Sequence, residues 1–283
     1  MTTRFEVRHR TVYRYGEMMS RGHTVTHLVP RSDGRQQVER WEISVDPEPD
    51  ERFGFDDAFG NHVVQFVVAT PHDRLTVTAT SCVDVEPADP VVDSTPWDAV
   101  HAWSPEVAGY AAPSPFATPS PELAEFARPS FVPGTPIEFV ARDVCHRIFT
   151  EFWFDPTFTE VATPLAEVLH ARRGVCQDFA HLAIACLRSF GLPARYVSGY
   201  VETVAPPGES KLVGTDASHA WFSVALGDGS WFDLDPTNNQ APPWRHVVVA
   251  YGRDYLDVAP ITGVVIGPVS IQELTVEVDV TST

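Results

Sequence analysis

The sequence lacks several features that would assign it to common protein classes. It has four cysteines, at positions 82, 145, 176 and 186, and none of them has the close CxxC spacing of a zinc site. Their scattered positions also argue against a disulfide framework. No apolar run approaches the roughly 20 residues that cross a bilayer. The first residues read as a strand, without the apolar stretch of a signal peptide, so we expect a cytoplasmic protein.

Positive charge is also scarce. The 283 residues include 20 Lys and Arg against 38 Asp and Glu, for a formal net charge of −18. Such a field repels phosphate backbones and anionic lipids, which predicts neither a nucleic-acid partner nor a membrane partner. Apolar residues make up 43% of the chain, enough for a substantial core. The length allows two domains or one domain with a large addition.

Residues 1–86 are predicted to form an N-terminal β-rich domain. Apolar and polar residues alternate here with period two, interrupted by turn residues such as those at 57–61. This pattern is typical of antiparallel sheet with one solvated face. Histidines are dispersed through the region, and we interpret each as a packing or surface residue: His9, His23, His27, His62 and His72.

Proline dominates the next segment, residues 87–134, which cannot be continuous helix or sheet. Its aromatic residues suggest a connection packed on a domain, with one short helix capped by Ser120. Residues 135–283 are assigned to a second, α+β domain. Its first helix is expected to begin at Thr135, which forms a capping box with Glu138. Its last strand is expected over residues 272–280.

Cys176 is predicted to lie in the first turn of a helix that ends before Gly191 and Pro193. Apolar residues recur at three- and four-residue steps, which predicts one buried stripe: Phe179, Ala183, Cys186, Leu187 and Phe190. The unpaired N–H groups and the dipole of a helix start favour an anion, and the thiolate is the nucleophilic form of cysteine. A lone cysteine is usually only a buried apolar residue. The downstream residues decide between these readings.

Two strands follow, joined by a tight turn at residues 227–229. Side chains alternate along each strand, so His219 shares a face with Trp221, and Asp233 shares a face with Asp235. Folding the hairpin brings His219 roughly opposite Asp235, with a register uncertain by one or two residues. Parity alone therefore leaves Asp233 and Asp235 as alternatives. An imidazole oriented by a carboxylate beside Cys176 has the logic of nucleophilic catalysis.

Four segments carry a family resemblance. They are Arg-Gly-Val-Cys-Gln-Asp-Phe-Ala-His at 173–181, Gly-Leu-Pro-Ala-Arg-Tyr-Val-Ser-Gly-Tyr at 191–200, Ala-Ser-His-Ala-Trp at 217–221 and Asp-Leu-Asp-Pro-Thr-Asn-Asn at 233–239. Together they resemble the bacterial transglutaminase-like family, within the transglutaminase and papain-like cysteine protease superfamily. The likeness covers roughly residues 139–258, and the N-terminal strands resemble the β-rich region that often precedes this domain.

The resemblance implies a papain-like core, with a cysteine-bearing helix packed on antiparallel sheet. It assigns the catalytic residues to Cys176, His219 and Asp235, choosing Asp235 over Asp233. Secondary candidates near the site are Gln177, Asp178, Trp153 and Trp221, with Trp153 or Gln177 as a possible second oxyanion donor. Residues 205–218 are expected to border the cleft. His181 is read as structural.

The implied chemistry is acyl transfer or hydrolysis at an amide through a thioester, with a peptide or protein as substrate. Water as acceptor gives an amidase or protease, and an amine gives a cross-linking enzyme or ligase. A catalytically inactive binding module remains an alternative. Cys176, His219 and Asp235 are also possible zinc ligands, but no fourth ligand is spaced to join them. No calcium loop is present, so we expect no metal and no cofactor.

Overall fold

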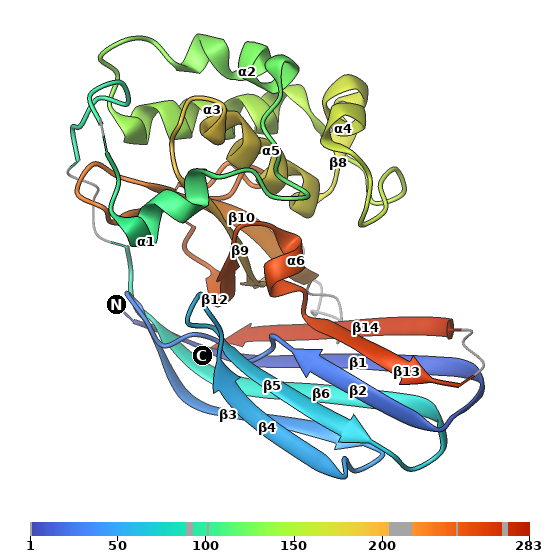
Figure 1. Cartoon of the computed structure of the whole chain (residues 1–283). Helices are drawn as coiled ribbons and strands as arrows, with labels where there is room; N and C mark the ends of the chain where they lie inside the picture. Colours follow the sequence, from blue (N-terminus) through green and yellow to red (C-terminus); the bar gives the residue numbers. More distant parts are fainter. Residues whose placement is uncertain (1, 89–92, 101, 204–216, 242, 268–270) are drawn as a thin grey trace, which may run out of the picture.

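The structure is a computed structural model that describes all residues except 1, 89–92, 101, 204–216, 242 and 268–270. It combines helices with antiparallel sheets, which confirms the predicted α+β class. Figure 1 shows a helical layer at the top, a four-stranded sheet beneath it and a β-sandwich at the bottom.

The sandwich consists of two four-stranded antiparallel sheets, ordered β14-β1-β6-β3 and β13-β2-β5-β4. Apolar side chains from both sheets, Ile43 and Val77 from one and Phe66 from the other, form its core. The strands are β1 (Thr3–Met19), β2 (Arg21–Thr26), β3 (Gln36–Asp46), β4 (Glu51–Asp56), β5 (His62–Val68), β6 (His72–Val85), β13 (Ile261–Ile266) and β14 (Ile271–Ser282).

The last two strands do not follow the assignment made from sequence. Residues 135–283 were expected to form one domain, but β14 pairs with β1 over eleven positions and β13 pairs with β2. Both sheets of the sandwich therefore need strands from the far end of the chain. A strand pattern shows only that one face is buried, so it cannot reveal which distant strand is its neighbour.

The second domain contains the sheet β11-β10-β9-β12 and most of the helices. Its strands are β7 (Trp153–Phe154), β8 (Arg173–Gly174), β9 (Ala194–Val201), β10 (Ala217–Ala225), β11 (Trp231–Leu234) and β12 (His246–Gly252). Its helices are α1 (Pro105–Ala108), α2 (Pro121–Ala127), α3 (Ile137–Glu151), α4 (Leu165–Ala171), α5 (Cys176–Arg188) and α6 (Tyr255–Val258).

Helix α5 is more deeply buried than its sequence pattern predicts. Every residue from Asp178 to Arg188 is buried, so the helix has no single buried stripe. One side packs on the sheet through residues such as Phe222, while α2, α3 and α4 cover the rest. A helix enclosed on all sides has no polar face to maintain, which explains the difference.

Two helix starts behave differently. Ser120 caps α2, because its hydroxyl accepts a hydrogen bond from the backbone N–H of Leu123, as predicted. Helix α3 begins at Ile137, and Pro136 occupies the cap position without a side-chain hydrogen bond. The capping box at Thr135 was therefore wrong. The backbone of Thr135 instead bonds Trp97 and Val132, which keeps this residue outside the helix.

Two carboxamides of the sandwich cover the outer edge of β12. Gln36 Nε2 donates to the carbonyl of Val248 and its Oε1 accepts from the Val248 N–H, both at 2.8 Å. Asn61 makes the same pair of bonds with Tyr251, also at 2.8 Å. These side chains act as short substitutes for a neighbouring strand. The turn at residues 57–61 thus joins the sandwich to the second domain.

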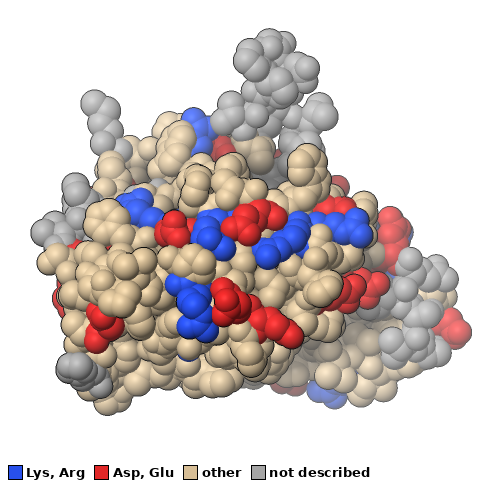
Figure 2. All heavy atoms as spheres, turned by 90° about the horizontal axis from the view of Figure 1, so that it is seen from above, with Lys and Arg blue, Asp and Glu red and all other residues tan. Residues whose placement is uncertain are grey.

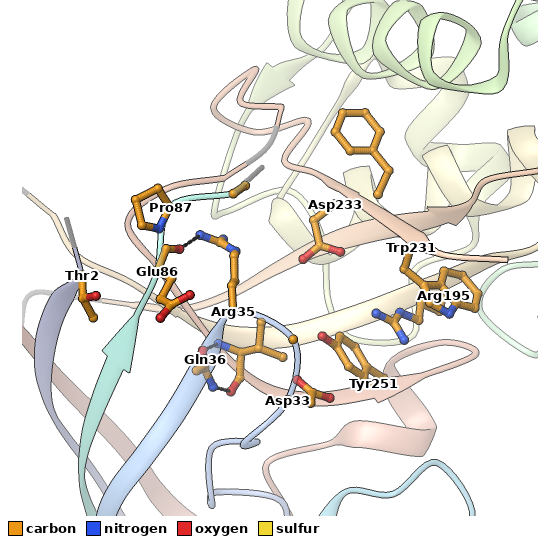
Figure 3. Close-up of a pocket in the computed structure, with 14 residues that line it drawn as sticks. Thr2, Asp33, Arg35, Gln36, Glu86, Pro87, Arg195, Trp231, Asp233 and Tyr251 are labelled. Atoms are coloured by element: carbon orange, nitrogen blue, oxygen red, sulfur yellow. Dashed lines mark hydrogen bonds between the residues drawn. The ribbon is translucent and has the colours of Figure 1, made fainter. Parts of the chain in front are cut away.

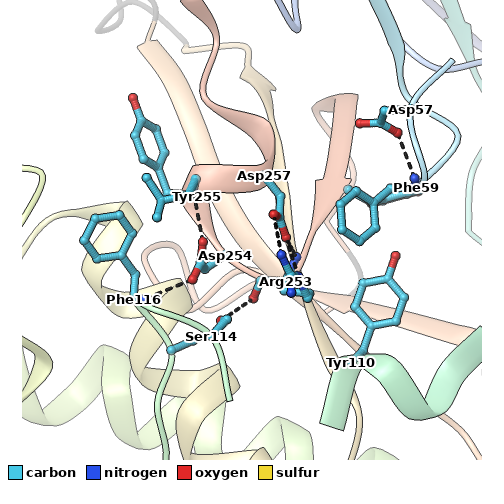
Figure 4. Close-up of polar contacts among 12 residues, drawn as sticks. Asp57, Phe59, Tyr110, Ser114, Phe116, Arg253, Asp254, Tyr255 and Asp257 are labelled. Atoms are coloured by element: carbon cyan, nitrogen blue, oxygen red, sulfur yellow. Dashed lines mark hydrogen bonds and ion pairs between the residues drawn. The ribbon is translucent and has the colours of Figure 1, made fainter. Parts of the chain in front are cut away.

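The proline-rich segment packs where it meets the turn at residues 57–61 and residues 253–257, as Figure 4 shows. Phe116 donates its N–H to Asp254 Oδ2, and the Ser114 hydroxyl bonds the carbonyl of Arg253. Arg188 from the end of α5 is buried beside them and donates to five acceptors, including the Tyr110 carbonyl. This arginine fastens the segment to the core.

Charged side chains on the helical face are mixed in sign. Figure 2 shows basic and acidic groups adjacent to one another over this face, seen from above. Within α3, Arg142 pairs with Glu138 and Arg147 pairs with Glu151. No helix in the described part of the chain combines the length and apolar character needed to cross a membrane.

Candidate active site

Cys176 is the first residue of α5, as predicted. The short parallel pair β7–β8 leads directly into it. Asp178 fixes this turn, because its Oδ2 accepts from the Val175 N–H at 2.8 Å and from the Thr159 hydroxyl at 2.7 Å. A Cβ at Gly174 would lie 2.8 Å from the same oxygen, so glycine is required for this approach.

Cys176 differs from the other three cysteines in its accessibility. Cys82, Cys145 and Cys186 are buried, whereas Cys176 is partly exposed. Burial raises the pKa of each buried thiol, to about 12 for Cys186. Of the four thiols, only that of Cys176 is open to an incoming reactant.

The hairpin β10–β11 brings His219 to Asp235. In the register of this hairpin, Phe222 pairs with Leu234. Asp235 therefore comes opposite Trp221, two residues along β10 from His219. This lies within the uncertainty allowed from the sequence. The chain turns after Leu234, and His219 Nε2 lies 2.8 Å from Asp235 Oδ2. Asp233 instead accepts a hydrogen bond from the Ser223 hydroxyl, so it does not reach His219.

Asp235 is completely buried and its carboxylate is saturated with donors. Oδ1 accepts from the backbone N–H groups of Thr237 and Asn238, at 2.9 and 3.2 Å. Oδ2 is shared by the Asn238 side chain at 2.7 Å, by His219 and by His246 at 2.9 Å. A buried carboxylate needs such partners, because an unpaired buried charge is strongly destabilising.

The surroundings of His219 and Asp235 favour the charged form of both side chains. Burial alone would lower the pKa of His219, but its hydrogen bond with Asp235 and its interaction with the Cys176 thiol outweigh burial and raise this pKa to about 10. Burial alone would raise the pKa of Asp235, yet hydrogen bonds from His219 and His246 hold it well below its usual range. Since Nε2 of His219 is engaged with Asp235, Nδ1 is the ring nitrogen left for the thiol.

His246 was not anticipated from the sequence. It lies on β12, which pairs with β9 and does not belong to the hairpin. Its ring is fully buried, and burial lowers its pKa despite the neighbouring carboxylate. Its Nδ1 has no hydrogen-bond partner in the part of the chain that the structure describes. The Arg-His pair at 245–246 offered one signal, a histidine opening a strongly apolar strand, but the pairing of β12 could not be read locally.

The Trp221 side chain packs against the rings of both His219 and His246. Its buried ring meets His246 edge-on with centroids 4.9 Å apart and lies 6.0 Å from the His219 ring. A Cβ at Gly199 would approach this indole to 2.5 Å, so glycine leaves room for the ring to cross β9. Trp221, one of the secondary candidates, thus lies beside the rings of His219 and His246.

The remaining candidates surround Cys176 in different ways. Gln177 Nε2 donates to the Val161 carbonyl at 3.2 Å, which engages one of its two amide N–H groups. The Trp153 side chain is 76% exposed on β7 and makes no described contact with His219 or Asp235. His181 is buried, accepts the N–H of Tyr255 and packs on Tyr196, consistent with a structural residue. Residues 205–216 of the expected cleft loop lie outside the described residues.

His219, Asp235 and His246 are also three possible metal ligands, with ligand atoms within 4.8 Å of one another. These same atoms are joined by hydrogen bonds through Asp235 Oδ2. A cation bound there would break both histidine hydrogen bonds and require an N–H at the unpartnered Nδ1 of His246. An unsatisfied buried donor is costly, so the arrangement suits a hydrogen-bonded network better than a metal site.

Comparisons with known proteins agree with this architecture. The model of the bacterial transglutaminase-like N-terminal region matches residues 5–84, and that of the transglutaminase-like superfamily matches residues 126–236. A crystal structure from Cytophaga hutchinsonii, provisionally named a cysteine protease, shares the fold with a TM-score of 0.77 and 20% identity. The alignment covers 100% of this chain and 91% of that one.

Two relatives bear on the family. An uncharacterized protein of Mycobacterium tuberculosis is 41% identical over 298 residues, covering 99% of this chain and 93% of the relative. Protein-glutamine gamma-glutamyltransferase of Pseudomonas aeruginosa is 36% identical over 96 residues, or 32% of this chain and 14% of that protein. The chain belongs to the bacterial transglutaminase-like family, as its four motifs predicted.

Proposed function

We propose that this protein is a thiol-dependent amide hydrolase, an amidase or protease, that uses Cys176, His219 and Asp235. The observation that carries the proposal is the position of His219, which is hydrogen-bonded to Asp235 at 2.8 Å and interacts with the thiol of Cys176. These contacts support the roles of nucleophile for Cys176, base for His219 and orienting carboxylate for Asp235.

In the first step, His219 Nδ1 takes the proton of the Cys176 thiol. The thiolate attacks the carbonyl carbon of an amide, forming a C–S bond and a tetrahedral oxyanion. Collapse breaks the C–N bond, and the imidazolium donates its proton to the leaving ammonia or amine. Water, deprotonated by His219, then attacks the thioester, and the released thiolate regains a proton from the ring. Asp235 holds the ring throughout and stabilises its charged form.

The oxyanion is served by the start of α5. Cys176 is the first residue of this helix, so its backbone N–H is not part of the helical ladder. Trp153 and Gln177 remain the two candidates for a second donor. Gln177 has one amide N–H in contact with Val161, and the other remains for a substrate oxygen.

His246 has the role of a positioning residue in this proposal. As a neutral ring it donates Nε2–H to Asp235 Oδ2, the oxygen that also meets His219. Sharing this oxygen fixes the carboxylate in place and draws part of its charge away from His219. The second histidine therefore limits how tightly Asp235 holds the imidazolium, which must release its proton in every cycle.

Amine transfer is the second candidate reaction. It is favoured by the likeness to the glutamyltransferase of Pseudomonas aeruginosa over 96 residues. A further observation fits it: the 283-residue chain has one lysine, Lys211, which lies outside the described residues. A protein with so few primary amines would rarely cross-link copies of itself. The two reactions share the thioester and differ only in the acceptor.

The test is to incubate the full chain with N-blocked glutaminyl-glycine and asparaginyl-glycine peptides, with and without a primary amine. Ammonia and peptide products are measured by mass spectrometry. We expect ammonia release or backbone cleavage without added amine. Incorporation of the amine as the main product would favour the transferase instead.

Cys176→Ala provides the control and Cys82→Ala the matched comparison, because Cys82 is buried in the sandwich. The first variant should lose all turnover and all labelling by iodoacetamide at near-neutral pH. Turnover that survives in Cys176→Ala, or faster labelling at Cys82 or Cys145, would overturn the proposal. Labelled but inactive wild-type protein would support the inactive binding module.

A further inference from the structure

A cavity of about 840 Å³ lies between the sandwich and the second domain. Its walls are the loop before β3, the end of β6 and the face of the β11-β10-β9-β12 sheet that points away from α5. Figure 3 shows Arg195 and Asp233 pointing into this space from the sheet, with Arg35 across from them. Its lining is polar and aromatic.

Arg195 is held rigidly at this cavity. Its guanidinium lies 3.4 Å from the ring centroid of Tyr251 and 4.3 Å from that of Trp231. No carboxylate pairs with it among the described residues, and its Nε has no hydrogen-bond partner. Stacking on the two aromatic rings fixes the plane of the guanidinium and leaves its terminal N–H groups free to donate. This geometry suits a planar carboxylate.

Asp233 supplies the opposite charge on the same face. It pairs with Ser223 in the hairpin, and Ser223 pairs with Arg195 on the other side, so the three residues form a row across three strands. Adjacent strands lie about 4.8 Å apart, which places the two charged residues about 10 Å apart at their Cα atoms. The Ser223 hydroxyl is the one hydrogen-bond donor to the Asp233 carboxylate among the described residues.

Three other charged residues line the cavity, namely Asp33, Arg35 and Glu86. Arg35 donates to two backbone carbonyls, those of Glu86 and Pro243, and neither Arg35 nor the Glu86 carboxylate forms an ion pair among the described residues. Asp33 is paired with Arg31 at 2.6 Å. A fixed cation and a separate carboxylate thus face one cavity without neutralising each other, although ion pairs are frequent elsewhere on the protein.

We propose that this cavity binds a small zwitterion, a free amino acid or short peptide. Its carboxylate meets Arg195 and its ammonium group meets Asp233. A simple anion would face Asp233 and the net charge of −18, and a simple cation would face two arginines. A ligand that carries both charges satisfies both ends at once.

The cavity is separate from the site at Cys176. A buried cluster of Val197, Trp221, Val248 and Tyr251 lies between it and the histidines on the same sheet face. His219 and Arg195 are four pairing positions apart along β9, since His219 pairs with Gly199. The proposal therefore stands independently of the reaction at the thiol.

Calorimetric titration of the full chain with glycylglycine tests the proposal. N-acetylglycylglycine lacks the ammonium group and glycylglycinamide lacks the carboxylate. We expect saturable binding of glycylglycine and affinities at least about 10-fold weaker for either blocked analogue, the size of one lost charged contact. No saturable glycylglycine binding, or equal affinities for all three peptides, would overturn it.

Two variants identify the contacts. Arg195→Met keeps a long unbranched side chain between the Tyr251 and Trp231 rings but removes its charge. It should abolish the preference for the peptide with a free carboxylate over the peptide amide. Asp233→Asn should abolish the preference for the free ammonium over the acetylated peptide. Arg8→Met, on the sandwich outside the cavity, is the matched control, and the melting temperature shows that each variant folds. If both cavity variants bind all three peptides as wild type does, the assignment fails.

Discussion

The face of the β11-β10-β9-β12 sheet that points away from α5 has two ends, and they differ in whether their charged groups are paired. At the end with His219 and His246, both rings share one oxygen of the buried Asp235. At the end with Arg195 and Asp233, the charges face an open cavity with no ion pair between them. One face of one sheet thus holds a closed network and an open pair of charges.

The difference indicates how to read polar residues on a sheet. Groups that satisfy one another are held in place for a reaction or for stability, because their mutual hydrogen bonds fix their orientation. Groups held rigidly but left unpaired are prepared for something that comes from outside. Changes at the closed end are expected to affect the reaction and the stability, and the loss of the carboxylate should matter most.

Asp235→Asn should have the largest effect. The amide presents N–H groups to donors that need an acceptor, so His219 loses its orientation and its charged form loses its counter-ion. We expect amide hydrolysis to fall by about 10³- to 10⁴-fold, as for other catalytic triads that lose this carboxylate. Steady-state kinetics on the active peptide measures the loss, with Asp84→Asn on the sandwich surface as the control.

The same variant also tests the separation of the two ends. Glycylglycine should still bind to Asp235→Asn with its wild-type affinity, because the cavity lies beyond the apolar cluster. A parallel loss of peptide binding would show that the two ends form one site.

Changes at His246 should have an intermediate effect. His246→Leu removes one donor from a buried carboxylate, so we expect kcat to fall about 10-fold. The acid limb of the pH profile should also move to higher pH, because a carboxylate with fewer donors is more basic. His246→Gln retains an N–H donor and should restore both kcat and the profile. Equal losses in the two variants, without a pH shift, would reduce His246 to a packing residue.

The smallest effect concerns stability against pH. His219 has a pKa raised to about 10, against about 6.5 in an unfolded chain. Its pairing therefore stabilises the fold fully below pH 6.5, and this contribution disappears as the pH rises toward 10. The free energy of unfolding in urea should decline over that window in the wild type and decline less in His219→Gln. Parallel curves would contradict the charged pair.

Much of the site was predictable because its signals are local. The cysteine at a helix start, the hairpin turn and the alternation that places His219 beside an aspartate each depend on a few neighbouring residues. Parity could not choose between Asp233 and Asp235, which differ by a full pleat. The family resemblance chose Asp235, and in the structure this residue is the one that contacts His219.

What escaped prediction depends on long-range pairing. His246 reaches Asp235 because β12 adds to β9, and β13 and β14 join the sandwich at the start of the chain. No local pattern encodes which strands become neighbours. The start of α3 failed for a related reason, because the bonds of Thr135 to Trp97 and Val132 oppose its tendency to cap.

The two carboxamides on β12 have a consequence for anyone who wishes to dissect the molecule. Gln36 and Asn61 occupy the backbone groups of Val248 and Tyr251. A fragment that starts after residue 86 would leave those groups bare on a strand that carries His246, and would leave β13 and β14 without β2 and β1. An unpaired strand edge of this kind favours aggregation with other chains. The sandwich thus shields the outer edge of β12, and the whole chain should be produced and studied as one unit.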